Sequence, residues 1–237
     1  MIKFFRQIRY KLMEAGKTSR YFKYAIGEII LVVVGILIAL SINNWNENNK
    51  NSKKEIVYLN KLISNLEDDI DLYQLIMAND STSMNGLRII QDVISNPSDN
   101  NIGKIKLNIQ NLMTGNNFIP NRTTFDNLIS SGQIEIISND SIVDQIFLYY
   151  RGTEDLEKGI DKAIAEYNRN TFGPFILSFG SFSDTNEDVS KYRNENMMVN
   201  SVRFKLNLLG NQLIRYSSQV DNANRLIDHL KKELNID

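Results

Sequence analysis

Residues 29–42 read IILVVVGILIALSI, and this stretch carries no charge. Aliphatic side chains fill it, and its only interruptions are Gly35, Ala39 and Ser41. With a few flanking residues on each side, the apolar segment reaches the roughly 20 residues that a helix needs to cross a bilayer. Glu28 lies near the end of the segment, where a charge opposes insertion less than it does at mid-membrane. The sequence therefore predicts a transmembrane helix at residues 24–43.

Positive charges gather on the N-terminal side of this segment. They are Lys3, Arg6, Arg9, Lys11, Lys17, Arg20 and Lys23, against the single acid Glu14. Because basic flanks stay in the cytoplasm, we expect a cytoplasmic N-terminus and export of everything after Trp45. Residues 1–23 also predict a basic amphipathic segment on anionic lipid, since their apolar side chains share one helical face. The alternative is a secretory signal peptide that is cut near Ala39 and Ser41.

Small residues line one stripe of the predicted span. Gly27, Gly35 and Ala39 fall on this stripe and favour the close approach of two such helices. Glu28 lies about one turn inside the cytoplasmic boundary. An ionisable group in a span is by default a hypothesis about function, and two roles are open for Glu28. It either reaches back to the basic residues before the span or contacts a second spanning helix in an oligomer.

Beyond the membrane segment, apolar residues recur at steps of three and four. This rhythm predicts long helices at residues 52–95, 140–171 and 197–235. The first would be about 65 Å long, and such a helix needs packed partners to be stable. Asp80 and Gln91 interrupt its seam, whereas the C-terminal helix keeps its rhythm without a polar step. The expected fold is all-α: one N-terminal transmembrane helix plus an extracytoplasmic bundle of long antiparallel, coiled-coil-like helices at residues 44–237.

Shorter elements connect the first two long helices. Helices are expected at residues 104–113 and 124–131. Thr123 and Asp126 have the spacing of a capping box, and Gly132 is suited to end the helix that they begin. Residues 134–137 favour a short extended piece. The next helix has two candidate N-cap residues, Asn139 and Asp140. A helix-turn-helix interpretation conflicts with export from the cytoplasm, so no nucleic-acid partner is expected.

The connection at residues 172–196 is too long for a bare turn in a compact bundle. It carries the aromatic side chains of Phe172, Phe175, Phe179 and Phe182. We expect these side chains either to close the end of the bundle or to dock into lipid or a protein partner near the bilayer.

The composition argues against enzyme chemistry. The 237-residue chain has no Cys, one His and a net charge of −1. With His229 alone and no thiol, a zinc site or a Ser/His arrangement lacks its residues, and no glycine-rich phosphate loop is present. The best acidic cluster is Glu67, Asp68, Asp69 and Asp71, and the heptad places it on a solvated face. We therefore expect no catalytic residues, no cofactor and no metal.

Three stretches carry a resemblance to a known family. They are MIKFFRQIRYKL at residues 1–12, YFKYAIGEIILVVVGILIALSINNWNE at residues 21–47 and TFDNLISSGQIEIISND at residues 124–140. The chain resembles an uncharacterised family of single-pass bacterial membrane proteins found mainly in flavobacteria and their relatives. The resemblance implies a Gram-negative inner membrane with the bulk of the chain in the periplasm. It implies no activity, because that family is a domain of unknown function.

Two functions are compatible with these patterns. The first is a membrane-anchored interaction or scaffold protein, homo-oligomeric or bound to a protein partner, whose helices need no buried polar site. The second is an extracytoplasmic sensor that binds a small ligand between its helices and signals through a partner subunit. The sequence predicts no buried polar site, which favours the first.

Overall fold

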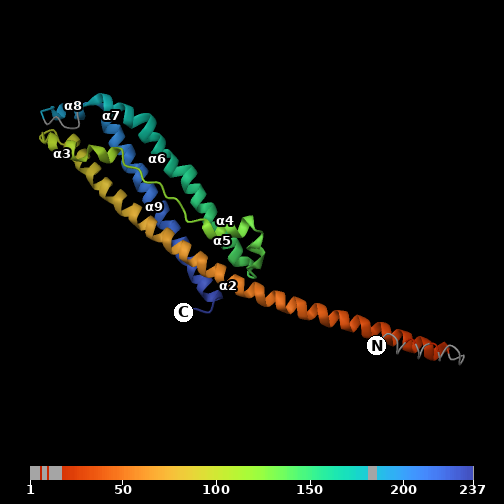
Figure 1. Ribbon diagram of the computed structural model, residues 1–237. Coiled ribbons are helices and arrows are strands. Elements are labelled where there is room, and N and C mark those ends of the chain that lie inside the picture. Colours follow the sequence, from red (N-terminus) through yellow and green to blue (C-terminus); the bar gives the residue numbers. More distant parts are fainter. Residues whose placement is uncertain (1–5, 7–9, 11–17, 181–185, 237) are drawn as a thin grey trace. The chain divides into compact units, whose positions relative to one another are not determined.

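The computed structural model describes residues 6, 10, 18–180 and 186–236. These residues form helices and connecting segments, and no strand occurs among them (Figure 1). The expected all-α class is confirmed for this part of the chain. The chain divides into two compact units, Met1–Glu55 and Ile56–Asp237. Most of the predicted amphipathic segment at residues 1–23 lies outside the described residues.

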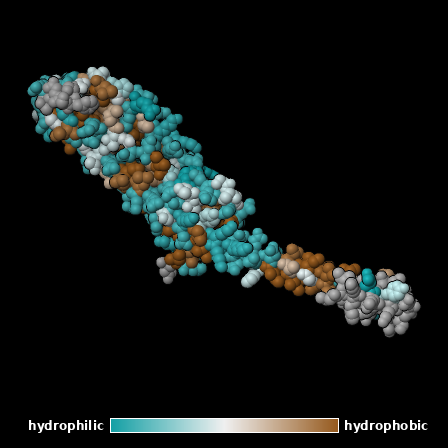
Figure 2. Space-filling view, viewed as in Figure 1, coloured by the Kyte–Doolittle hydropathy of each residue, from teal (hydrophilic) through white to brown (hydrophobic). Residues whose placement is uncertain are grey.

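Helix α2 begins at Thr18 and ends at Ser95, so the boundary between the two units falls within it. Residues 29–42 expose their side chains all around the helix and form the brown surface in Figure 2. With a mean hydropathy that reaches 2.8, this helix is apolar and long enough to cross a membrane. No helix was predicted at residues 44–51, between the helices expected at residues 24–43 and 52–95. Those residues are helical, because the segment contains neither Pro nor Gly to end a helix.

The unit Ile56–Asp237 contains the rest of α2 and every later helix that is described. After α2 come α3 (Ile102–Asn108), η1 (Ile109–Leu112), α4 (Thr123–Ser130), η2 (Gln133–Ile136), α5 (Asp140–Leu156), η3 (Glu157–Asp161), α6 (Lys162–Glu166), η4 (Tyr167–Phe172), α7 (Gly173–Phe179), α8 (Val189–Arg193) and α9 (Asn196–Glu233). Figure 1 shows α9 alongside both α2 and the run from α5 to α7. The Tyr73 ring meets Tyr216, whereas Met84 lies against Gly210, so α2 and α9 are antiparallel.

Buried apolar side chains form clusters at successive levels of this unit. The level nearest α8 includes Leu87, Ile105, Ile176, Tyr192 and Leu209. The middle level consists of Tyr73, Ile76, Phe118, Leu156 and Tyr216. The level nearest α4 includes Leu62, Leu128, Ile146, Tyr149 and Leu226. Because helices far apart in sequence contribute to each level, the unit has a core of its own.

The aromatic connection differs from the loop expected at residues 172–196. It contains α7 and α8, because Pro174 lies in the first turn of α7, where proline is compatible with a helix. Phe172 is fully buried, and Phe175 and Phe179 are half-buried against the same core level. The Phe179 ring contacts Tyr192 edge-on at 5.1 Å. These side chains close this end of the unit, and Phe182 lies outside the described residues.

The helix starts and stops predicted around residues 123–140 are partly confirmed. Gly132 adopts a left-handed φ of 67° directly after the C-cap of α4, as expected for a helix stop. Asn139 caps α5 by accepting a hydrogen bond from the backbone N–H of Ser141. The capping box is wrong: the N-cap residue of α4 is Arg122, whose side chain makes no cap hydrogen bond, and Asp126 pairs with Arg122. The backbone N–H of Thr124 donates instead to Asn65 Oδ1 of α2 at 3.3 Å. The extended piece is also wrong, because η2 is a 3₁₀ helix.

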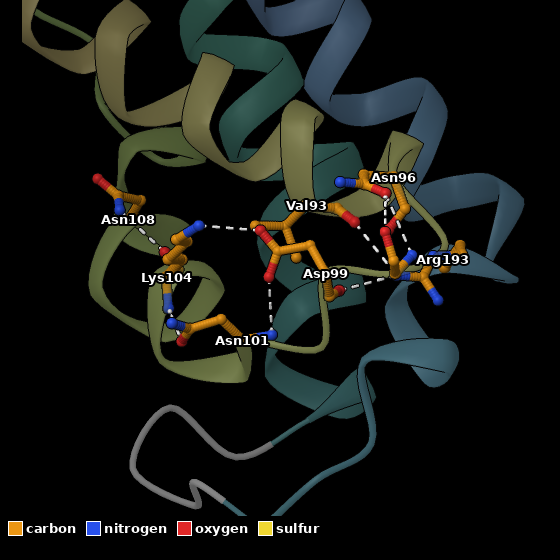
Figure 3. A network of polar contacts seen from close by, with 8 residues as sticks. Val93, Asn96, Asp99, Asn101, Lys104, Asn108 and Arg193 are labelled. Carbon is orange, nitrogen blue, oxygen red and sulfur yellow. Dashed lines mark hydrogen bonds and ion pairs between the residues drawn. The ribbon is translucent and has the colours of Figure 1, made fainter.

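Arg193 ties α8 to the end of α2, as Figure 3 shows. Its guanidinium donates hydrogen bonds to the backbone carbonyls of Val93, Ile94, Asn96 and Asp99. The carbonyls at a helix C-terminus lack partners within the helix, and a cation there also complements the helix dipole. On the other side of the turn, the Asp99 carboxylate accepts from Lys104 Nζ at 2.9 Å and from the Asn101 N–H at 3.0 Å (Figure 3).

Candidate functional site: a buried polar layer

Polar residues occupy the buried seams of both α2 and α9. On α9, Lys205, Gln212 and Gln219 follow one another at seven-residue steps and are all buried. The prediction that α9 has no polar step in its seam is therefore wrong. The predicted stripe shares Val202, Leu209 and Tyr216 with the buried face, whereas its other edge, including Leu206 and Leu213, is only half-buried. The buried face of α9 was therefore predicted slightly too far round the helix, because the prediction counted only apolar residues as buried.

The seam of α2 is polar at three points among its described residues. Asp69, Asp80 and Ser83 are buried. Asp80 was recognised as an interruption of the heptad, but the acidic cluster that includes Asp69 was expected on a solvated face. Asp69 instead points inward and accepts hydrogen bonds from the Tyr149 hydroxyl at 2.8 Å and from the Asn121 N–H at 2.7 Å. Burial raises the pKa of its carboxyl, and these two hydrogen bonds oppose that rise.

The helical run from α5 to α7 contains two π-helical segments, η3 and η4. Each supplies a side chain to a buried polar residue of α9. Asp161 in η3 accepts from Gln212 Nε2 at 2.8 Å, and Asn168 in η4 accepts from Lys205 Nζ at 3.0 Å. The two donors, Lys205 and Gln212, are seven residues apart on α9, and the two acceptors, Asp161 and Asn168, are seven residues apart on the antiparallel run. The two hydrogen-bonded pairs therefore lie one after the other along the unit. Short π-helical segments often occur at functional sites.

A non-helical segment, residues 114–122, runs beside these side chains, and among its residues Phe118 is buried whereas the others are half-buried or exposed. Its backbone groups have no helical partners, and polar side chains bond them instead. Four of these bonds link Thr114 O to Lys205 Nζ, Asn116 O to Gln212 Nε2, Phe118 N–H to the Tyr216 hydroxyl and Asn121 N–H to Asp69. One role of the buried polar groups is therefore to hold this segment in place.

We use the term polar layer for Asp80, Asp161, Lys205, Gln212 and Tyr216, which are all at most 1% exposed. The Tyr216 hydroxyl donates to Asp161 Oδ1 at 2.7 Å, and Gln212 Nε2 also lies 3.0 Å from the Tyr216 oxygen. α2, η3 and α9 thus each contribute to the layer. None of these roles was predicted from the sequence beyond the position of Asp80.

Several oxygen atoms at this level have no hydrogen-bond donor among the described residues. They are both carboxylate oxygens of Asp80, Asp161 Oδ2, Gln212 Oε1 and the Tyr73 hydroxyl oxygen. Burial raises the pKa of Asp80 to about 6, although the charge of Lys205 and the side chain of Asn116 oppose the rise. Burial also lowers the pKa of Lys205 to about 8, and Asp80 opposes that fall. A buried polar group without a partner is energetically costly, so this arrangement calls for an explanation.

Among the described residues, no group of three or more His, Asp and Glu side chains is placed to hold a metal ion. His229 is exposed, and its Nδ1 contacts Gln145 Oε1. The chemistry that the polar layer itself can perform is proton binding and hydrogen bonding.

The candidate residues in the apolar stretch of α2 lie on its exposed surface. No atom lies within 4 Å of the position that a Cβ would take at Gly27 or Gly35. Ala39 is exposed and Glu28 is half-buried. The stripe therefore has room for a neighbouring helix, and its role in association stays a prediction.

A surface hollow of about 510 Å³ lies between α4 and α5. The guanidinium of Arg122 lies over the rings of Phe125 and Tyr150, at 5.1 and 5.4 Å from their centres. Ile129 and Phe147 line the same hollow and are partly exposed. This region coincides with the motif at residues 124–140.

A family model covers the centre of the chain. Residues 28–166 match DUF6090, a family of unknown function. The chain belongs to the DUF6090 family. The matched region begins in the apolar stretch of α2 and ends in α6, so it contains Asp80 and Asp161 but not α9. No curated protein and no solved structure matches the chain. The restriction of the resembled family to flavobacteria and their relatives, and its single-pass topology, remain predictions.

Proposed function

We propose that this DUF6090 protein is a non-enzymatic, membrane-anchored interaction protein of the bacterial inner membrane. The apolar stretch of α2 spans the bilayer with the N-terminus in the cytoplasm. The unit Ile56–Asp237 lies in the periplasm as an antiparallel, coiled-coil-like helical bundle and contacts a protein partner or a second copy. The observation that carries this proposal is the apolar stretch at residues 29–42, which is exposed all around the helix, while the other unit has its own core.

Two further features support the proposal. The basic residues before the span favour retention of the N-terminus in the cytoplasm. The hollow between α4 and α5 carries the partly exposed side chains of Ile129 and Phe147 next to Arg122, and aromatic and arginine side chains are enriched at protein interfaces.

The anchor and its orientation are tested with topology reporters. A periplasm-active phosphatase fused after Asp237 should be active, and a fluorescent protein that fails to mature in the periplasm should be dark at the same site. The chain should stay in the membrane fraction after alkaline carbonate washing, with its N-terminus uncut. A mature chain that begins after Ser41 and is freely soluble would mean that the apolar stretch is a signal peptide.

The partner is sought by photo-cross-linking in the native membrane. A photoreactive amino acid replaces Phe147 in one strain and the exposed Asn207 in a control strain. The proposal expects one discrete cross-linked product, a second copy or a hetero-complex, from position 147 and none from position 207. Equal labelling at both positions would remove the hollow as an interaction surface.

One observation favours the second function, an extracytoplasmic sensor that signals through a partner subunit. The polar layer contains buried oxygens without donors, and helical bundles bind small ligands at such levels. A metabolite that raises the unfolding temperature of wild type, but not of Gln212→Leu, would support the sensor. No stabilisation by a broad metabolite library would favour the interaction protein.

A further inference from the structure

Two buried carboxylates and one buried ammonium belong to the polar layer. Asp80 comes from α2, Asp161 from η3 and Lys205 from α9. If all three were ionised, the layer would hold one uncompensated negative charge, which is unfavourable away from water. The fields of Asp161 and Lys205 both act on Asp80, so the three groups are electrostatically coupled.

The remaining titratable neighbours do not balance this charge. Tyr73 and Tyr216 are neutral phenols whose pKa values are raised by burial and by nearby acids. Glu157 adds a further negative field to Asp161. Residues 114–121, the side of the layer formed by the non-helical segment, contribute no titratable side chain.

We propose that Asp80 and Asp161 form a proton-binding site that holds one proton while Lys205 remains charged. The proton comes from solvent and forms an O–H bond on a carboxylate oxygen of Asp80. This changes the layer from a net charge of −1 to neutrality. All residues involved belong to the unit Ile56–Asp237, so proton binding is independent of the membrane anchor.

The pattern of hydrogen bonds supports this assignment. Among the described residues, four of the five buried side-chain atoms without partners are acceptors when the carboxyls are ionised, and the fifth is the Tyr73 hydroxyl. A protonated Asp80 supplies a further donor, and Asp161 Oδ2 and Gln212 Oε1 are acceptors at the same level. Asp161 Oδ1 already accepts from Tyr216 and Gln212, whereas neither Asp80 oxygen meets the geometry of a hydrogen bond, although the Asn116 side chain lies near enough to oppose the rise of its pKa. Asp80 is therefore the natural site for the proton.

Proton binding is linked to the segment at residues 114–122 through shared hydrogen bonds. Gln212 Nε2 bonds both Asp161 and the carbonyl of Asn116, and Lys205 Nζ bonds the carbonyl of Thr114. When Asp80 is ionised, its negative charge attracts the same two donors, Gln212 Nε2 and Lys205 Nζ. Loss of the proton should therefore weaken their hydrogen bonds to the backbone of residues 114–122. Acidification should have the opposite effect and order this segment more tightly.

The direction of the pH dependence follows from the raised pKa of Asp80. Between its unfolded value of 3.8 and its folded value of about 6, the folded state binds more protons than the unfolded state. The free energy of unfolding therefore falls as pH rises through this window. The folding equilibrium constant should drop by up to about tenfold for each pH unit and each proton.

The proton is observed directly by infrared spectroscopy on the full chain in detergent micelles. Spectra of wild type at pH 5 and pH 8 should differ by the carbonyl stretch of a buried, protonated carboxylic acid. Asp80→Asn should weaken or remove this band, whereas Asp92→Asn, an exposed acid on the same helix, should retain it in full. Absence of the band from wild type overturns the proposal without any variant. Because Asp69 is also a buried carboxyl, the decisive comparison is with wild type: an undiminished band in folded Asp80→Asn overturns the proposal as well.

A second measurement follows denaturant unfolding of the full chain between pH 4.5 and 7.5. Wild type and Asp92→Asn should lose stability as pH rises, and Asp80→Asn should show a flatter profile, whatever its absolute stability. If Asp80→Asn is too unstable to fold, Asp161→Asn replaces it and should flatten the profile in the same way. Parallel profiles for wild type and the folded variant overturn the proposal.

Discussion

At the scale of single residues, the effect of a buried polar group depends on whether its partners are present. Tyr73 and Tyr216 illustrate this, because they are buried at the same level with their rings 4.9 Å apart. The Tyr216 hydroxyl donates to Asp161 and accepts from the Phe118 N–H, whereas the Tyr73 hydroxyl has no partner among the described residues. The same chemical change at these two positions should therefore have different consequences.

We expect Tyr216→Phe to lower the free energy of unfolding by about 1–3 kcal/mol, because it leaves buried groups of Asp161 and Phe118 unsatisfied. Tyr73→Phe removes an unpartnered hydroxyl and should change stability by less than about 0.5 kcal/mol or raise it. Denaturant unfolding of the full chain in detergent at pH 7 measures both. Equal losses of stability for the two variants would mean that the Tyr73 hydroxyl does make a hydrogen bond in the folded protein.

The residue scale also shows where the sequence was uninformative. Asp80 was recognised because it interrupts an otherwise apolar heptad. Lys205 and Gln212 were not, since the apolar residues beside them form an uninterrupted stripe of their own and leave no visible gap. The buried face of α9 includes one row of that stripe and the polar row beside it. Which rows are buried depends on the packing of neighbouring helices, and periodicity in a single sequence does not encode it.

At the scale of elements, the long helices followed from the heptad rhythm, because a sustained apolar period is the strongest local signal. The π-helical segments did not. A π turn displaces the pattern by one residue, but Leu156, Ile160 and Ala163 still follow steps of four and three across η3, so the sequence shows no displacement there. Their presence depends on tertiary contacts, in which Asp161 and Asn168 reach the polar residues of α9.

Gly173 shows what the second π segment requires. Its backbone N–H donates to the carbonyl of Asn168, five residues earlier, and a Cβ at this position would lie only 2.6 Å from that oxygen. Backbone cannot yield as a flexible side chain can, so the turn must open to accept a larger residue. Gly159, in the first π segment, has no atom within 4 Å of its Cβ position.

We therefore expect Gly173→Ala to destabilise the protein by about 1–3 kcal/mol through steric overlap. The matched control Gly159→Ala should be neutral or stabilising by up to about 1 kcal/mol, because alanine restricts the unfolded chain and favours helices. Thermal unfolding followed by circular dichroism compares the two in one experiment. Stabilisation by both substitutions would show that the turn at Gly173 accommodates a side chain freely.

At the scale of the whole molecule, the apolar stretch of α2 and the unit Ile56–Asp237 have surfaces of different character. The apolar stretch of α2 is brown in Figure 2, whereas much of the visible surface over Ile56–Asp237 is teal. The predicted apolar helix near the N-terminus is confirmed as a helix long and apolar enough to cross a membrane, since hydropathy depends on composition and needs no tertiary information. What a span does beyond anchoring depends on its small residues, which pack well only against another helix.

If the spans associate, bulky residues on the small stripe should separate them. We expect the double change Gly35→Ile and Ala39→Ile to reduce the oligomeric fraction at least severalfold, because the Cβ branches hold two backbones apart. Val33→Ile, on the opposite side of the helix, is the control and should leave the fraction unchanged. Light scattering in mild detergent and cross-linking in native membranes give the oligomeric state. If the double variant cross-links as wild type does, the spans do not associate through this stripe, and any self-contact must arise from the helical unit.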